Sequence, residues 1–376
     1  MRPTFARAGT TAHAPERARV RCVAAIGQIY VLIAVACPPN AWAQEHVAIR
    51  TDVLFYGDNT EFRNLFREGE TIFGAAVRLA AAIELNDRLS LSIGGFGNQR
   101  FGSADAFEQV RPVIALTMRG QRSLFILGTL PPPGASAPVG PDRGGPHALL
   151  PPLQRETLTF DRPYEAGIAW AFTGATLEQA FWLGWQRLNT PEHRERFDGG
   201  TNMSFRVSDG LSLPVQVHVV HEGGQLHSAG PVSDDAAGAI GVHLKRKLTA
   251  KTLGSLEAFG LASRHVPDRS QPDLSVNGTA FFGRASVERS GWRGHIIFWR
   301  GRNFIKDEGD HNYLSIRRGG ERYRGTRDYS EAGLTRRFTL APSAILEASG
   351  RLHRVENRYE YSFRVLSVVS ASWKIH

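Results

Sequence analysis

The chain has 376 residues, of which 42% are hydrophobic and 22% charged, and its mean hydropathy is −0.25. This composition is too apolar for a disordered chain and too polar for a bundle of membrane helices. The chain carries 39 Gly and 20 Pro, and 10% of its residues are aromatic, which favours strands and turns over long helices. We therefore expect an all-β protein.

The first 43 residues have the pattern of an export signal. A stretch that carries several arginines precedes a largely apolar run from Val23 to Cys37, and the Ala-Trp-Ala sequence at 41–43 offers a cleavage point between small residues. The apolar run is shorter than the ~20 residues that a membrane-spanning helix needs. We predict a signal peptide over 1–43 and an exported domain over 44–376. The alternative is a lipoprotein signal in which Cys37 carries the lipid.

From Glu45 onward the dominant pattern is alternation with a period of two, which places successive side chains on opposite faces of a strand. Between Phe73 and Leu85, for example, every odd position is apolar while the even positions are small or charged. We predict about sixteen strands. Their ranges are 46–56, 70–85, 88–99, 105–119, 122–130, 160–173, 175–189, 197–208, 210–223, 234–248, 252–265, 276–289, 292–304, 326–340, 342–356 and 358–375.

The connections between these segments alternate in length. Every second connection is a tight turn, such as Asn86-Asp87 or Ser290-Gly291, and most of the others are long. The last connection, near Asn357, is short and breaks the alternation. Short turns at one end and long loops at the other are typical of outer-membrane barrels whose two termini face the periplasm. The long connections are 57–69, 100–104, 131–159, 190–196, 224–233, 266–275 and 305–325.

These features together resemble the porin-type outer-membrane β-barrels of Gram-negative bacteria. The resemblance covers residues 44–376 as an architecture, and no short porin motif accompanies it. It implies a transmembrane antiparallel β-barrel of about sixteen strands that the outer-membrane assembly machinery inserts, although the chain ends in His376 where this class usually has an aromatic residue. In general porins the third outer loop narrows the lumen, and here that loop is the proline-rich 131–159. Its charged residues are the expected constriction: Asp142, Arg143, His147, Arg155 and Glu156.

If the apolar positions face lipid, the opposite strand faces give a charged lumen in which basic groups are in excess. Such a lining attracts anions. The alternative is that these charges pair across strands and fill the interior as a network of salt bridges. The expected lining residues are Arg50, Asp52, Arg78, Glu84, Arg111, Arg119, Arg206, His218, His243, Lys245, Arg284, Glu288, Glu331, Arg337, Glu347, Arg351, His353 and Arg364.

The leading interpretation is a porin-like channel for passive passage of small polar or anionic solutes, without a catalytic residue, a metal or a cofactor. His218 and His221 lie near Glu222, but on a strand the two histidines point to opposite faces, which disfavours a shared metal ion. The alternatives are a plugged structural or envelope-assembly barrel, an exopolysaccharide export channel, and a barrel-borne lipid hydrolase. The expected partners are outer-membrane lipid and lipopolysaccharide, with no nucleic acid, and homo-trimers are common in this class.

Overall fold

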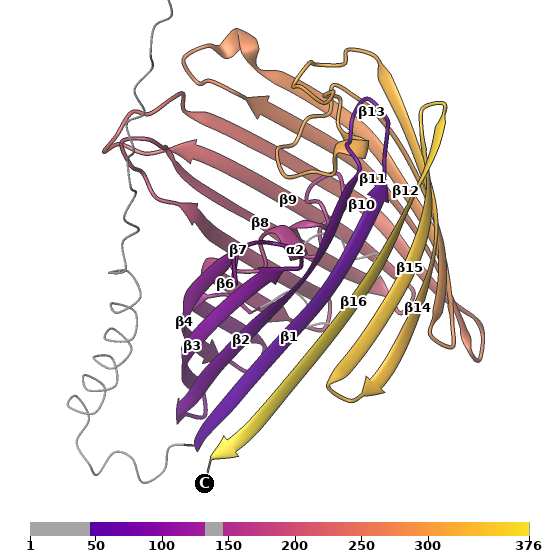
Figure 1. The fold of residues 1–376 in the computed structure, drawn as a ribbon. Helices are drawn as coiled ribbons and strands as arrows, with labels where there is room; N and C mark the ends of the chain where they lie inside the picture. Colours follow the sequence, from indigo (N-terminus) through magenta and orange to yellow (C-terminus); the bar gives the residue numbers. More distant parts are fainter. Residues whose placement is uncertain (1–45, 132–145, 376) are drawn as a thin grey trace, which may run out of the picture. The chain divides into compact units, whose positions relative to one another are not determined.

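A computed structural model describes residues 46–131 and 146–375 (Figure 1). Within these ranges, sixteen antiparallel strands form one closed barrel in which every strand pairs with its neighbours in sequence and β1 closes on β16. The predicted all-β barrel is confirmed, whereas the predicted signal peptide lies outside the described residues. The strands are β1 (His46–Glu61), β2 (Glu70–Asn86), β3 (Leu89–Arg100), β4 (Gln109–Arg119), β5 (Ser123–Thr129), β6 (Ala166–Thr173), β7 (Leu177–Arg187), β8 (Glu195–Ser208), β9 (Leu211–Gly223), β10 (Ser233–Thr249), β11 (Thr252–Val266), β12 (Val276–Arg289), β13 (Trp292–Arg302), β14 (Thr326–Ala341), β15 (Ala344–Val355) and β16 (Arg358–Ile375).

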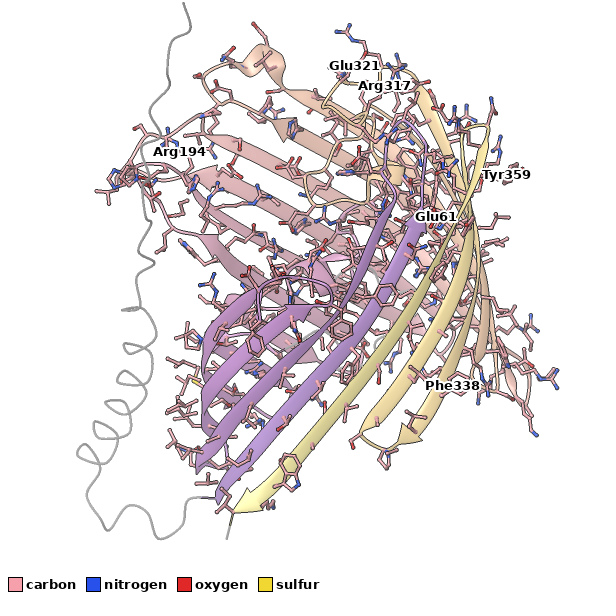
Figure 2. All side chains as sticks on the ribbon, in the orientation of Figure 1. Glu61, Arg194, Arg317, Glu321, Phe338 and Tyr359 are labelled. Carbon is pink, nitrogen blue, oxygen red and sulfur yellow. The ribbon has the colours of Figure 1, made fainter. Side chains whose placement is uncertain are left out.

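The strand alternation separates an apolar outer face from an inner face that packs in the interior. In β2, Ala76 and Ala80 are buried, whereas Val77 and Leu79 are exposed on the outer face. Phe338 and Tyr359 point away from the barrel near its two opposite ends (Figure 2). A continuous exposed apolar band around a closed barrel is the surface of a protein that spans a membrane.

The two ends of the barrel differ in the length of their connections. The start of β1, the end of β16 and the short turns lie at one end, and the long connections lie at the other (Figure 1). Ser290 and Gly291, which join β12 to β13, both have positive φ angles, of 50° and 77°. This is the two-residue turn whose twist matches that of antiparallel strands, and it needs a glycine for the strained conformation. We call these ends the short-turn end and the long-loop end.

The strand predicted to start at residue 160 begins at Ala166 instead, and a helical turn, α2 (Leu158–Asp161), precedes it. The apolar side chain of Phe160 suggested a strand, but its backbone amide bonds to Thr157 in a helical turn. Pro163 follows and cannot donate a strand hydrogen bond. Neither α2 nor any other helix in the described ranges is long and apolar enough to cross a bilayer.

The interior of the barrel is packed with side chains rather than left as a wide lumen. Two long connections, 146–165 and 303–316, fold inward and contribute the fully buried Leu149, Leu153 and Phe304. These residues belong to the same apolar cluster as Phe282 and Trp299 from the wall, which are also fully buried. A core of this density excludes water from the part of the interior that it fills. We call these two parts of the connections the 146–165 segment and the 303–316 segment.

Candidate active site

All eighteen charged residues predicted to line the lumen lie on the strand faces that point inward. Arg78, for example, lies between the buried Ala76 and Ala80 on β2, and Arg364 lies between the buried Ser362 and Leu366 on β16. Their placement follows from the two-residue period alone. That they line an open passage stays a prediction.

Many of these inward charges are neutralised by neighbours. Arg284 bonds to Glu257 at 2.9 Å, and Arg206 lies 3.2 Å from Glu178. Arg337 bonds to Glu347 in the adjacent strand. These pairs fit the alternative hypothesis, in which the inward charges form a network of salt bridges. Such pairing reduces the positive electrostatic field that an open basic lumen would have.

Three of the five predicted constriction residues are placed by the structure, and each is fixed by interior contacts. His147 stacks on Trp182 with 3.9 Å between ring centroids, and its Nε2 lies 2.9 Å from a carboxylate oxygen of Glu165. Arg155 bonds to Asp161 at 3.1 Å, and Glu156 bonds to two wall arginines. Asp142 and Arg143 lie outside the described residues.

The 303–316 segment brings Glu308 into a buried cluster with Asp198 and His218 of the wall and Arg162 of the 146–165 segment. Arg162 donates to Glu308 at 2.7 Å and lies 3.5 Å from Asp198, while His218 lies 3.3 Å from Asp198. Burial alone would raise the pKa of Glu308, but the charge of Arg162 outweighs it and holds that pKa at about 2. The cluster is therefore an ionised buried network that attaches both inserted segments to the wall.

The ligand atoms of Asp198, His218 and Glu308 lie within 4.8 Å of one another, which is close enough for a metal ion. A cation in this position would be repelled by Arg162, which already bonds to Glu308 and compensates its charge. The same holds for a second group, Asp235, His265 and Asp307, because Lys306 bonds to Asp235. Both groups thus fit ion-pair clusters better than metal sites.

A different arrangement of polar residues lies at the inner face of β14, β15 and β16. Ser362 Oγ lies 2.8 Å from His353 Nε2, and the other ring nitrogen, Nδ1, lies 2.7 Å from the hydroxyl of Tyr329. That hydroxyl donates to Glu331 at 2.6 Å, and Glu331 lies 3.4 Å from His353 Nδ1 directly. His295 lies 2.8 Å from the other Glu331 oxygen. All of these residues are buried.

The available donors assign the direction of this chain of hydrogen bonds. Tyr329 donates its only proton to Glu331, so the proton between Tyr329 and His353 must come from His353 Nδ1. With the proton on Nδ1 alone, His353 has a lone pair on Nε2 that can accept the proton of Ser362. This is the histidine tautomer that can act as a general base on a serine hydroxyl.

Phe62, the first residue of the loop 62–69, packs on this histidine at the long-loop end. The Phe62 ring meets His353 edge-on at 4.9 Å between centroids. Glu360 of β16 holds the loop by accepting from the Arg63 amide at 2.7 Å and from Asn64 at 2.6 Å. Phe62 is therefore one of the side chains that bury His353, and Glu360 fixes the loop that carries it.

A polar pocket of about 450 Å³ borders Phe62 at the rim of the barrel. Glu61 marks it in Figure 2. The charged residues of its lining are Glu61, Glu68, Glu70, Arg63 and Arg318. It offers polar groups at the level where lipid headgroups meet a barrel of this kind.

The alternation of apolar and polar residues places His353 and Glu331 on the inward face but does not show that they meet. They are direct partners in the β14–β15 register, which no single-strand pattern reveals. Ser362 and Tyr329 were missed because a neutral hydroxyl on an inward face has no distinguishing pattern. One sequence signal could have indicated the site: Tyr329, Glu331 and His353 all occupy odd-numbered positions, which face inward in β14 and β15.

A second cavity, of about 860 Å³, lies inside the barrel and is bordered by residues of the short turns. Its lining includes the predicted Arg206, His243, Lys245, Arg284 and Arg337. Leu149 and Leu150 of the 146–165 segment also border it. This vestibule has a mixed lining, because Glu178, Asp209, Glu257 and Glu288 border it as well.

Comparisons with known proteins agree with the fold and add a family. A family model described as lipid A 3′-O-deacylase-type matches residues 39–376. The Vibrio cholerae outer-membrane protein OmpT, as a loop L8 deletion mutant, is similar with a TM-score of 0.51 at 10% identity, covering 87% of this chain and 99% of that one. Pseudomonas aeruginosa OccK8 (OprE) gives 0.50 at 11% identity, covering 88% and 98%. No curated protein matches the sequence.

Proposed function

Because the chain belongs to the lipid A 3′-O-deacylase-type family, we propose that it is an outer-membrane hydrolase that removes an ester-linked acyl chain from lipid A. The observation that carries this proposal is the hydrogen-bonded chain from Ser362 through His353 to Glu331. A serine, a histidine in the matching tautomer and a carboxylate at these distances form the arrangement used for nucleophilic attack on esters.

In this proposal the Ser362 oxygen attacks the ester carbonyl carbon while its proton passes to His353 Nε2. Tyr329 and Glu331 hold Nδ1 and stabilise the imidazolium that forms. The sugar oxygen leaves as an alcohol with the proton from His353, and the acyl group stays on Ser362 as an ester. Water, deprotonated by His353, then attacks this ester, so that the fatty acid is released and Ser362 regains its proton.

Ser362 is 8% exposed, so substrate reaches it only if the packing around it opens, and Phe62, which packs on His353, is the side chain that we expect to move. The rim pocket beside Phe62 is the place where a polar headgroup would lie before the ester reaches the serine. Closure of the site by a short loop keeps water away from the base until substrate enters.

The test is mass spectrometry of lipid A from outer membranes that carry the wild-type protein, the Ser362→Ala variant or the Ser90→Ala variant. Ser90 is a matched control because it is another buried inward serine, bonded to Arg119 at 3.1 Å. We expect loss of an acyl chain with wild type and with Ser90→Ala, and at least roughly 10³-fold slower loss with Ser362→Ala. Intact lipid A with wild type, or undiminished deacylation with Ser362→Ala, contradicts the proposal.

The vestibule favours a second candidate function, a channel for small anionic solutes. Lys245 and His243 line it beside arginines that are paired with carboxylates, and the barrel fold is that of outer-membrane proteins. Planar-bilayer recordings with a salt gradient test it: a steady ohmic conductance biased towards chloride supports the channel, and a protein without openings speaks against it.

A further inference from the structure

A shallow apolar groove crosses the outer face of the wall from β10 to β15. It encloses about 990 Å³, and much of its lining comes from Leu244, Leu256, Ile296, Leu334 and Leu352. Each of these side chains is between 45% and 61% exposed. Such a concave apolar surface on the membrane-facing wall is complementary in shape to a hydrocarbon chain.

Two glycines keep the floor of the groove low. Gly294 and Gly350 flank Leu334 in one row across three strands. A Cβ atom placed on either glycine would meet no other atom within 4 Å, so neither glycine is required by a close backbone contact. Glycine in the interior of a strand weakens it and often marks the close approach of a ligand. These two positions therefore point to an occupant that fills the space.

The groove is basic where it approaches the short-turn end. Arg246 lines the groove. Closer to the short-turn end, Trp292 of β13 is paired with Arg289 of β12 on one side and with Arg336 of β14 on the other. The Arg336 guanidinium lies 5.1 Å from the centroid of the Trp292 ring. Among the residues that the structure describes, Arg246 and Arg289 form no ion pair. Two arginines without an ion pair on this part of the outer face, one of them beside a tryptophan, are complementary to a lipid phosphate.

We propose that this groove binds an anionic glycerophospholipid from the leaflet at the short-turn end. One acyl chain lies over Gly294 and Gly350, and the phosphate lies between Arg246 and Arg289. The proposal does not depend on the proposed hydrolysis, because the groove is on the outer face of the wall whereas Ser362 is on the inner face.

The test uses the full-length protein isolated from outer membranes in a mild detergent and stripped of lipid. Native mass spectrometry then measures binding of dioleoyl phosphatidylglycerol and of dioleoyl phosphatidylethanolamine. We expect tighter binding of phosphatidylglycerol, reduced roughly fivefold by each of the substitutions Arg246→Gln and Arg289→Gln. Arg300→Gln is the control, since Arg300 is also exposed on the outer face but lies 3.6 Å from Asp328; it should leave binding unchanged.

The glycine floor is tested separately by Gly294→Leu, which fills the groove and should weaken binding of both lipids. Gly260→Leu is its control, because a Cβ on Gly260 also meets nothing within 4 Å and Gly260 does not line the groove. Equal affinity for the two lipids, or phosphatidylglycerol binding that survives the arginine substitutions, overturns the proposal. So does a dimer that Gly294→Leu dissociates, because the groove would then be an interface between two copies.

Discussion

Glu156 of the 146–165 segment accepts a hydrogen bond from Arg351 of β15, with 2.9 Å between Arg351 Nη2 and Glu156 Oε2. The same carboxylate oxygen lies 2.6 Å from Arg364 of β16, which also bonds to Asp58 of β1 at 2.8 Å. The side chains of Glu156, Arg351 and Arg364 are only 10–14% exposed. One carboxylate on an inserted segment is thus attached to two wall strands, and a third is connected through Arg364.

Replacing Glu156 with Gln should loosen the 146–165 segment from the wall. Two buried guanidinium groups lose a shared carboxylate, but Arg364 keeps Asp58 and Arg351 keeps Glu331, so the cost should be below the about 3–5 kcal/mol of a buried charge left unpaired. We expect a lower urea midpoint and more frequent or larger openings in planar bilayers than with wild type. Arg206→Gln is the control, because Arg206 and Glu178 are each 55% exposed and such a pair contributes about 0–1 kcal/mol. Unchanged conductance and midpoint with Glu156→Gln would mean that this carboxylate does not retain the segment.

The buried cluster around Glu308 predicts sensitivity to acid. The pKa of Glu308 falls from an ordinary 4.5 to about 2, because Arg162 outweighs the cost of burial. A carboxyl with a lowered folded-state pKa stabilises the fold above pH 4.5, and this stability is lost as the pH falls from 4.5 towards 2. The contribution at neutral pH is on the order of 3 kcal/mol.

Urea midpoints measured from pH 7 to pH 3 for wild type and for Glu308→Gln test this prediction. Other carboxylates also titrate in this range, so the informative quantity is the difference between the two proteins. We expect the variant to be less stable at pH 7, with the two curves converging towards pH 3. Parallel curves would show that Glu308 is not held ionised by Arg162.

The outer face could be predicted from the sequence because lipid requires an apolar side chain at every second position. Ile296 is exposed on that face as its pattern indicates. The interior could be predicted less well, because charged inward residues suggested a wet lumen although inward positions also carry Phe282 and Trp299, which are fully buried. Inward aromatic residues of this size were the available sign of a packed interior.

The candidate active site depends on register, which a sequence pattern leaves open. Glu331 and His353 become partners only when β14 and β15 pair as they do, and Ser362 reaches His353 across the next strand pair. The fold of the 146–165 segment is also set by tertiary contacts, such as the bond from the Leu150 amide to Gln216 at 2.8 Å. Local propensity carries no information on such contacts between distant residues.

Removing the Tyr329 hydroxyl should impair deacylation without changing the nucleophile. In Tyr329→Phe, His353 Nδ1 loses its nearest acceptor and retains only Glu331, at 3.4 Å. We expect kcat to fall by no more than about 10²-fold while KM stays the same, because the histidine is less well oriented but still present. Rates of fatty-acid release at several substrate concentrations measure both constants. A rise in KM with unchanged kcat would assign Tyr329 to substrate binding instead.

The depth of the outer face in the bilayer can be tested with arginine substitutions on the exposed apolar residues. Ile296, which is 61% exposed in the middle of β13, should lie near the bilayer midplane, whereas Leu340, which is 64% exposed beside the turn after β14, should lie near the interface. Arginine costs about 2–4 kcal/mol at the midplane and about 0–1 kcal/mol near the interface. Folding titrations in phospholipid vesicles should therefore show a much larger loss of folding free energy for Ile296→Arg than for Leu340→Arg. The two side chains are similarly exposed, so a difference in burial cannot explain the result. Equal losses of folding free energy for the two variants would mean that the apolar band lies at a different height on the barrel.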